Sequence, residues 1–362
     1  MKKSLLALAV LGAFAGAASA QSSVTLYGTV DLSGKYVKND GSTKRLSLAR
    51  DGINSSQLGF RGVEDLGGGL KAGFDLLASV GADSGDIGAG QSATGSGKFF
   101  TRRSVIKLIG NFGEIRAGRD YTPTFWNDTI FDAFGTNGLG DSSHVGQVLS
   151  STFVRADNSV EYYLPPNLGG FYGQGMAATG EGPQAGQGTN AGRYLGVRFG
   201  FAAGPFDVAA AYGTQRNGDA AGDSQKTYNI GGAYDFGFLK VMGYVDRDTV
   251  GILKDTRGSI SVVVPFGQSE VHVGYSRSKA TKDNTAVAPA ASNGLTNTIW
   301  QAAATYQYNL SKRTALYGTV STLSNGDFSR NSVAGGTSSN PSPASVVGPT
   351  SKGFELGMRH FF

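Results

Sequence analysis

Segments in which apolar and polar residues alternate strictly recur along nearly the whole chain. In VTLYGTVDLSGKY (24–36) one parity is apolar and the other carries polar residues such as Thr29, Asp31 and Lys35. VRADNSVEYYL (154–164) and RYLGVRFGF (193–201) show the same pattern. Successive side chains of a β-strand point to opposite faces, so a period of two predicts strands with one apolar and one polar face. Because helix-period patterning is essentially absent, the sequence predicts an all-β fold.

Two kinds of connection alternate between these segments. Short ones carry Gly, Pro, Asn or Asp and lie at 64–69, 111–113, 165–170, 202–205, 235–237, 265–268 and 309–313. Long polar ones lie at 38–47, 81–97, 121–147, 180–191, 215–225, 247–256, 279–296 and 325–351. Gly and Pro supply the dihedral angles of tight hairpin turns, so we count sixteen strands with every long loop at the same end. An even strand number, one short-turn end and aromatic residues beside several turns predict an outer-membrane β-barrel.

The N-terminal segment predicts export. Lys2 and Lys3 precede an apolar run that ends in Ala18-Ser19-Ala20, which is the arrangement of a cleaved signal peptide at 1–20 and leaves the barrel at 21–362. After residue 20 no run of about 18 apolar residues follows, so no spanning helix is expected. The chain has no cysteine and a formal charge of +5, with scattered basic residues. Disulfides and Cys-based metal or redox chemistry are therefore excluded, and binding of nucleic acid is not predicted.

The chain finishes on KGFELGMRHFF, which alternates in the same way. Phe354, Leu356, Met358 and Phe362 share one parity. We expect these side chains to face lipid on a final strand that closes against the first one, because only a closed barrel pairs all its backbone groups within a bilayer. Such a strand would also be the segment that a barrel-assembly machinery reads. A secreted β-sandwich alternates too, but a sandwich of this length would need two domains, and no linker between them is visible.

Several segments, in this order along the chain, resemble the general porins of Gram-negative bacteria, and most closely the neisserial and Burkholderiales-type porins. These segments are SSVTLYGTVD, LGFRGVEDLGGGLKAGF, FTRRSVIKLIGNFGEIRAGRDYTP, RADNSVEYYLPPNLGGFYG and GMRHFF. The resemblance implies a sixteen-stranded antiparallel barrel in the outer membrane, usually a homotrimer, in contact with outer-membrane lipids and lipopolysaccharide. It also implies a water-filled pore through which small hydrophilic solutes and ions diffuse.

The resemblance further implies a constriction made by a third loop, about 120–148, that folds into the lumen. In such porins acidic loop residues face basic residues of the wall. Asp128 and Asp132 occupy the acidic positions, and Arg102 and Arg155 the basic ones. A third basic position of many relatives is Gln57 here, which weakens the basic wall and leaves the direction of ion selectivity open.

Parity reasoning from the residues agrees for Arg155, whose parity mates are polar, but leaves Arg102 and Arg103 undecided. Arg103 and Lys107 share one face of RRSVIKLI and Arg102 the other, and a charge facing lipid at the membrane midplane costs about 2–4 kcal/mol. One of these basic side chains is therefore expected near an interface or in a subunit contact.

Catalysis is not predicted. The three histidines, His144, His272 and His360, are too far apart for a metal site, and no nucleophile stands beside a base. No cofactor motif is present, since the Gly-rich 88–98 lacks phosphate-loop spacing. Two other hypotheses remain beside a diffusion pore: a barrel enzyme, and an adhesin that binds partners through its loops at 279–296 and 325–351.

Overall fold

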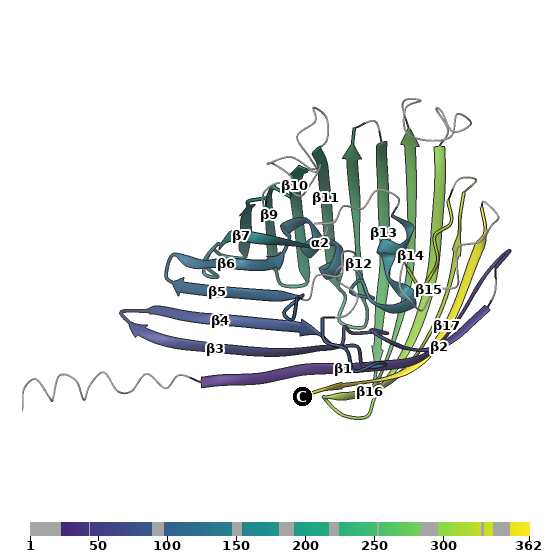
Figure 1. Cartoon of the computed structure of the whole chain (residues 1–362), viewed down its shortest axis with the longest axis horizontal. Helices are drawn as coiled ribbons and strands as arrows, with labels where there is room; N and C mark the ends of the chain where they lie inside the picture. Colours follow the sequence, from purple (N-terminus) through teal and green to yellow (C-terminus); the bar gives the residue numbers. More distant parts are fainter. Residues whose placement is uncertain are drawn as a thin grey trace, which may run out of the picture.

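Antiparallel strands make up most of this protein (Figure 1), in a computed structural model that describes residues 23–42, 44–88, 98–146, 154–180, 192–216, 224–251, 253–282, 296–326, 329–335 and 348–362. The expected leader, 1–20, lies outside this range. The strands are β1 (Ser23–Asn39), β2 (Lys44–Arg50), β3 (Gln57–Gly67), β4 (Leu70–Ser79), β5 (Arg103–Gly110), β6 (Gly113–Tyr121), β7 (Arg155–Tyr163), β8 (Phe171–Ala178), β9 (Tyr194–Ala203), β10 (Phe206–Arg216), β11 (Ser224–Asp235), β12 (Lys240–Val250), β13 (Leu253–Phe266), β14 (Ser269–Lys282), β15 (Thr296–Asn309), β16 (Thr314–Ser324) and β17 (Thr350–Phe361). Between β6 and β7 lie the helix α2 (Pro123–Ile130) and two 3₁₀ turns, η1 (Gly138–Gly140) and η2 (Ser142–Val145).

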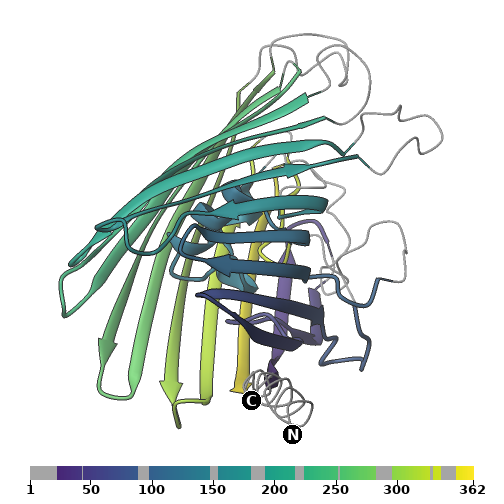
Figure 2. The ribbon, with the colours of Figure 1, turned by 90° about the vertical axis from the view of Figure 1, so that its left-hand side faces the viewer.

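The strands form one closed ring. From β3 to β17 each strand pairs antiparallel with the next one in the chain, and β1 pairs with both β2 and β3. The strand β17 pairs with β1 from Thr29↔Phe361 to Asn39↔Ser351, which closes the sheet. The strands are strongly tilted relative to one another around the ring (Figure 2). Closure leaves no open seam between the first and the last strand, which is the condition for a sheet within lipid.

The second strand of the barrel is interrupted. β2 pairs with the C-terminal part of β1, from Leu32↔Arg50 to Lys38↔Lys44. β3 pairs with the N-terminal part of β1, from Ser23↔Val63 to Thr29↔Gln57. Residues 51–56 leave the ladder between them, so β2 and β3 together occupy one position in the ring. The described part of the chain therefore forms a sixteen-stranded antiparallel barrel, which confirms the predicted fold and strand number.

The barrel carries polar residues on its inner face and apolar residues on its outer face. On β1 the inward Asp31, Ser33 and Lys35 are buried, whereas Val24 and Leu26 on the outer face are 67% and 55% exposed. The same holds on β17, where Glu355 is buried while Phe354, Leu356, Met358 and Phe362 lie on the outer surface. Exposed apolar side chains around a closed ring are what lipid contact requires. None of the helices in the described ranges is long and apolar enough to cross a membrane, a finding that does not bear on spanning by strands.

The prediction of two of the long loops is wrong. Residues 38–47 and 247–256 are mostly strand, because β1 and β2 are separated only by 40–43, and β12 and β13 only by 251–252. Polar residues occupy both faces there, as with the buried Asp246 and Asp248 and the exposed Arg247 of β12. Above the apolar band the outer face of a strand is polar as well, so alternation disappears although strand pairing continues.

Candidate pore constriction

The segment between β6 and β7, described for 122–146 and called loop 3 below, folds into the barrel. Its helix α2 begins at Thr122, whose Oγ1 accepts a hydrogen bond from the backbone N–H of Phe125, and Pro123 occupies the first helical position. Both features favour a helix start at this point. The helix lies inside the curve of the strands in Figures 1 and 2 and contacts β8 to β11. Loop 3 therefore occupies part of the lumen.

One side of loop 3 is attached to the wall formed by β10 to β13. Asn127 donates through Nδ2 to Oδ1 of Asn229 (2.9 Å) and to the carbonyl of Ala209 (3.1 Å). Asp128 accepts from Nη2 of Arg257 at 2.9 Å, and the same nitrogen lies 3.2 Å from Asp246. These groups are buried. A buried ion pair and amide hydrogen bonds thus hold α2 against this wall.

A later part of loop 3 is attached near the β17–β1 junction. The backbone N–H of Leu139 donates to Oε1 of Glu355 (3.1 Å), and Nε2 of Gln301 donates to the Leu139 carbonyl (2.8 Å). A buried apolar cluster surrounds this point: Val37, Leu139, Val145, Ile299, Leu323, Val333 and Ala334. Between the two attachments, the N–H of Ala133 donates to Oγ of Ser261 (2.9 Å), and its carbonyl lies 2.9 Å from Nδ1 of His272. Loop 3 therefore follows the inside of the wall from β8 to β17.

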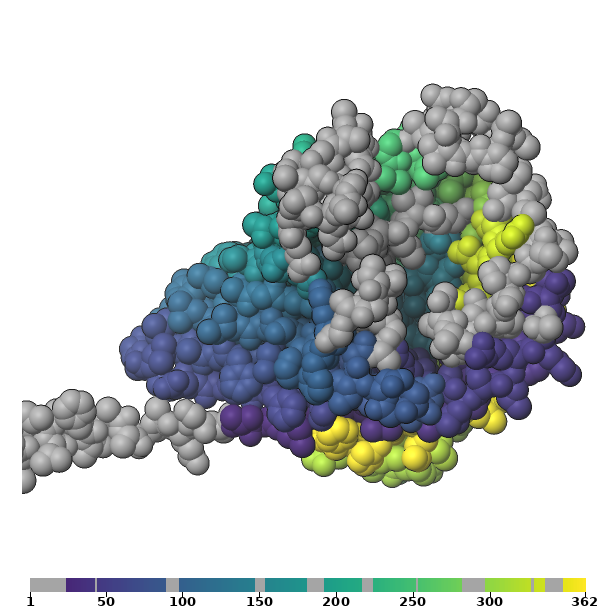
Figure 3. Space-filling model, viewed as in Figure 1, coloured from purple at the N-terminus to yellow at the C-terminus, as the bar shows by residue number. Residues whose placement is uncertain are grey.

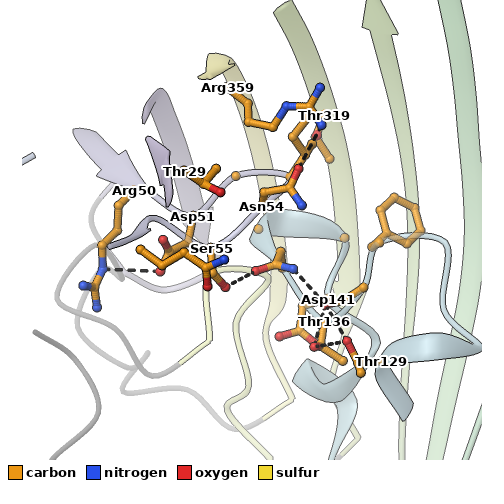
Figure 4. A pocket seen from close by; sticks show the side chains of 18 of the residues that line it. Thr29, Arg50, Asp51, Asn54, Ser55, Thr129, Thr136, Asp141, Thr319 and Arg359 are labelled. Atoms are coloured by element: carbon orange, nitrogen blue, oxygen red, sulfur yellow. Dashed lines mark hydrogen bonds and ion pairs between the residues drawn. The ribbon is translucent and has the colours of Figure 1, made fainter. Parts of the chain in front are cut away.

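The break in the second barrel strand makes another inward projection. Asp31 of β1 accepts hydrogen bonds from the backbone N–H groups of Gly52, Ile53 and Asn54, at 2.7 to 3.1 Å. Ser55 in turn donates to Oδ1 of Asn137 on loop 3 (2.7 Å). One carboxylate thus fixes the backbone of the projection, and the projection meets loop 3. Figure 4 shows Asp51, Asn54 and Ser55 on one side of the pocket, with Thr129, Thr136 and Asp141 of loop 3 on the other.

A cavity of about 2040 Å³ remains beside loop 3. Its lining includes Gln268 and Lys312, which lie in short turns, and also Asp83 and Asp86, which lie in the long loop between β4 and β5 at the opposite end. The cavity therefore extends from one end of the barrel to the other. The space-filling view shows the corresponding hollow between the teal and the yellow strands (Figure 3).

Arg102 and Arg155 meet at Tyr121 on the wall of this cavity. Both donate to the Tyr121 hydroxyl through Nη2, at 3.0 and 2.8 Å. The Arg155 guanidinium also lies over the Tyr121 ring, with Cζ 4.3 Å from the centroid. Arg102 additionally donates to Oγ of Ser79 at 3.5 Å, and Ser79 pairs across the strands with Gln57. The structure thus brings Arg102, Arg155 and Gln57 to one region of the lining, although each arginine is largely buried.

Neighbouring arginines are paired with carboxylates instead. Arg119 lies 2.6 Å from Asp157, and Arg103 lies 2.7 Å from Asp120 and 3.2 Å from Asp75. Arg102 and Arg103 both point inward although they are adjacent, because β5 begins only at Arg103 and Arg102 belongs to the preceding loop. The strand parity that separates consecutive side chains does not apply across that boundary.

The two predicted acidic residues of loop 3, Asp132 and Asp128, are arranged differently from each other. Asp132 lines the cavity, but its carboxylate accepts hydrogen bonds from the N–H groups of Phe134 (3.2 Å) and Thr136 (3.4 Å) and from Ser142 Oγ (2.9 Å). Burial raises its pKa to about 6. Asp128 is absent from the cavity lining and faces Arg257. Burial raises its pKa to about 7 against the opposing attraction of Arg257, which also serves Asp246 and Asp248.

Comparison with known proteins identifies the family. The family model described as Gram-negative porin matches residues 7–327. This chain belongs to the Gram-negative porins. Outer membrane porin protein 32 of Delftia acidovorans is 37% identical over the full length of both chains. The sequence resemblance to this family is therefore confirmed.

Solved structures agree with the barrel of this porin. An anion-selective porin from Comamonas acidovorans superposes with a TM-score of 0.78 at 33% identity, over 94% of this chain and all of that one. OmpT of Vibrio cholerae, solved in a trimer form, gives a TM-score of 0.65 at 13% identity over 94% of this chain and 99% of that one, and shows the fold alone. The porin is an outer-membrane channel for passive diffusion and not an enzyme.

Sequence reasoning missed the residues that hold the porin's loop 3 and the inward projection at 51–56. Arg257, Glu355 and Asp31 are inward charges on strands whose parity the sequence shows, so each could have been marked as facing the lumen. Their partners lie 129, 216 and about 20 residues away along the chain, and no local pattern connects them. Tyr121 was likewise counted only as part of the loop. Most of the two loops behind the adhesin hypothesis, namely 283–295 and 336–347, lies outside the described residues.

Proposed function

We propose that this porin conducts small hydrophilic solutes with a weak preference for anions, set at a constriction between loop 3 and the wall around Tyr121. The observation that carries the proposal is that Arg102 and Arg155 converge on the Tyr121 hydroxyl, where the hydrogen bonds of Arg102 go to neutral oxygens. The acids of loop 3 are engaged elsewhere. Asp128 faces Arg257, while Asp132 and Asp141 accept hydrogen bonds from N–H groups of their own loop. The positive charge at this level of the pore is therefore less compensated than the negative charge.

The expected preference is weak for two reasons. Among the described residues that line the cavity, seven are Lys or Arg and six are Asp or Glu, so the lumen as a whole is nearly balanced. Gln57 adds no charge beside Arg102. A local excess of fixed charge biases ion choice without excluding the opposite ion, because salt screens it within about 10 Å at 0.1 M. The name of the Comamonas relative, an anion-selective porin, supports the same direction.

Reversal potentials across a planar bilayer test the proposal. In a tenfold KCl gradient we expect a sign that corresponds to chloride preference, and Arg102→Gln or Arg155→Gln should move the potential towards cation preference. Arg277→Gln removes the same charge from an exposed position on β14 and serves as the control. A cation-preferring wild type, or arginine variants that behave like Arg277→Gln, would contradict the proposal.

We also propose a homotrimer, whose apolar outer surface contacts outer-membrane lipids and lipopolysaccharide. The family resemblance and the trimer form of OmpT support it. Phe354, Leu356, Met358 and Phe362 lie on the outer face of β17, where barrel-assembly machinery could read them. Native mass spectrometry of the detergent-extracted protein tests the trimer, and a mass of a single chain would contradict it.

A further inference from the structure

Aromatic side chains stand directly beside the two arginines of the constriction. Tyr121, Phe125 and Trp126 line the same cavity as Arg102 and Arg155, and these five residues are called the Tyr121 cluster here. Transport of water-soluble ions needs no aromatic surface at this level of a pore. The cluster therefore calls for a reason of its own, either packing of loop 3 or contact with solutes.

The three rings have different surroundings. Phe125 stacks on Tyr121 with a centroid distance of 5.6 Å and an interplanar angle of 8°, and it is only 7% exposed. The Arg155 guanidinium lies over the Tyr121 ring as well. Phe125 and Tyr121 are thus engaged in packing loop 3 against the wall. Trp126 lies 5.2 Å from the Tyr121 centroid at a tilt of 53° and stays partly exposed in the cavity.

Nothing but packing fixes the orientation of the Trp126 ring. Its Nε1 has no hydrogen-bond partner among the described residues, nor does Nε of Arg102. Buried Trp N–H groups usually find an acceptor, because an unmade hydrogen bond costs free energy. The indole can therefore tilt towards a solute without breaking a hydrogen bond, and the Arg102 guanidinium retains donor capacity.

We propose that the Tyr121 cluster is a subsite for planar aromatic carboxylates of the benzoate class. The ring of the solute stacks on Trp126, and its carboxylate accepts hydrogen bonds from the guanidiniums gathered at Tyr121. Guanidinium and carboxylate match in geometry and charge, and aromatic faces favour offset stacking with another ring. The inference rests on the proposed anion preference and specifies the solutes that benefit most from it.

Block of the chloride current by three sodium salts tests the inference on the full-length porin. Benzoate and cyclohexanecarboxylate carry the same charge and a ring of similar size, but only benzoate has a π-face; acetate has no ring. We expect benzoate to block at a concentration about 2- to 10-fold lower than cyclohexanecarboxylate, which is the gain expected from aromatic pairing. Because the two salts are compared within one variant, their ratio is independent of changes in chloride conductance.

Substitutions test whether the stronger block by benzoate arises at the Tyr121 cluster. Trp126→Leu should bring the ratio of the two blocking concentrations to about one, whereas Trp126→Phe should keep most of it. Trp300→Leu is the control, because this other tryptophan stacks on Tyr275 away from the cavity lining. Arg102→Gln should weaken the block by both ring compounds together.

A ratio of the two blocking concentrations of one in the wild type, or a ratio that survives Trp126→Leu, would overturn the inference. A wild type without chloride preference would instead refute the proposed function, and the reversal potential reports this separately.

Discussion

Replacement of Arg257 by methionine should release loop 3 from one wall of the barrel. The guanidinium is 1% exposed and lies within 2.9, 3.2 and 3.9 Å of Asp128, Asp246 and Asp248. Methionine has a similar length but supplies no charge and no hydrogen-bond donor. The substitution therefore leaves three carboxylates together in a buried region, two of them on β12 and one on loop 3. They repel one another, and only the loop can move away.

The expected cost exceeds that of any other single polar contact on that side of loop 3. Removal of one partner from a buried ion pair costs about 3–5 kcal/mol, and protonation of the carboxylates keeps the value near the lower end. The two hydrogen bonds from Asn127 to Asn229 and to the Ala209 carbonyl contribute about 0.5–1.5 kcal/mol each. Later attachments of the loop remain, among them Ala133 with Ser261 and Leu139 with Glu355. We therefore expect α2 to move away from the wall and widen the aperture, while these attachments hold the rest of the loop.

Single-channel conductance and liposome swelling measure this widening. The Arg257→Met porin should show larger current steps than wild type and should admit a disaccharide faster relative to a monosaccharide. Asp128→Asn should have a smaller effect, because Arg257 then keeps Asp246 as its partner. Arg247→Met on β12 is the control, since Arg247 is exposed. Wild-type conductance and size discrimination in Arg257→Met would refute the view that this ion pair positions loop 3.

Three further results are expected. Burial raises the pKa of Asp132 to about 6 and that of Asp128 to about 7, whereas an aspartate in an unfolded chain has a pKa of about 3.9. Folded loop 3 therefore binds more protons than the unfolded chain does. Its attachment is strongest below about pH 4 and weakens as the pH rises through 6 to 7. Protease cleavage of loop 3 should rise over that range and vary less in Asp128→Asn, and a pH-independent rate would contradict this. Gly28→Val should reduce the yield of closed barrel on heat-shift gels, because a Cβ at Gly28 would overlap the Phe362 ring and the Gln57 carbonyl oxygen. A normal yield would show that the junction can adjust. Asp31→Ala should lower the free energy of unfolding by about 2–4 kcal/mol in urea titrations, because it leaves the N–H groups of the inward projection without their acceptor. A change below about 0.5 kcal/mol would argue against that role of Asp31.

The barrel could be predicted because lipid imposes one rule on every strand. The outer residues, such as Leu26 and Leu356, must be apolar, whereas the inner ones, such as Asp31 and Glu355, can be polar or charged. This alternation repeats often enough to reveal sixteen strands. It failed at 38–47 and 247–256 because the rule ends where the strands leave the bilayer and both faces become polar.

The constriction could be predicted only in part. The positions of Arg102 and Arg155 followed from family resemblance, whereas their convergence on Tyr121 depends on a bend before β5 that parity does not describe. The engagement of Asp128 with Arg257 depends on how the loop folds against the inside of the wall, and sequence spacing carries no information about that path. The sequence contains many inward-facing charged residues, and which two of them form a pair depends on their distance in the folded protein.

The attachment of loop 3 along consecutive strands also has a mechanical consequence. A wide cylinder made of one sheet bends easily into an ellipse, because bending changes the angles between strands but breaks few hydrogen bonds. Here Asp128 ties the loop to β13, Ala133 ties it to β13 and β14, and Leu139 ties it to β15 and β17. The loop therefore acts as a brace on the inner face of these strands. With this brace in place, bending of that part of the cylinder is resisted from within, and the cross-section of the pore keeps its shape there.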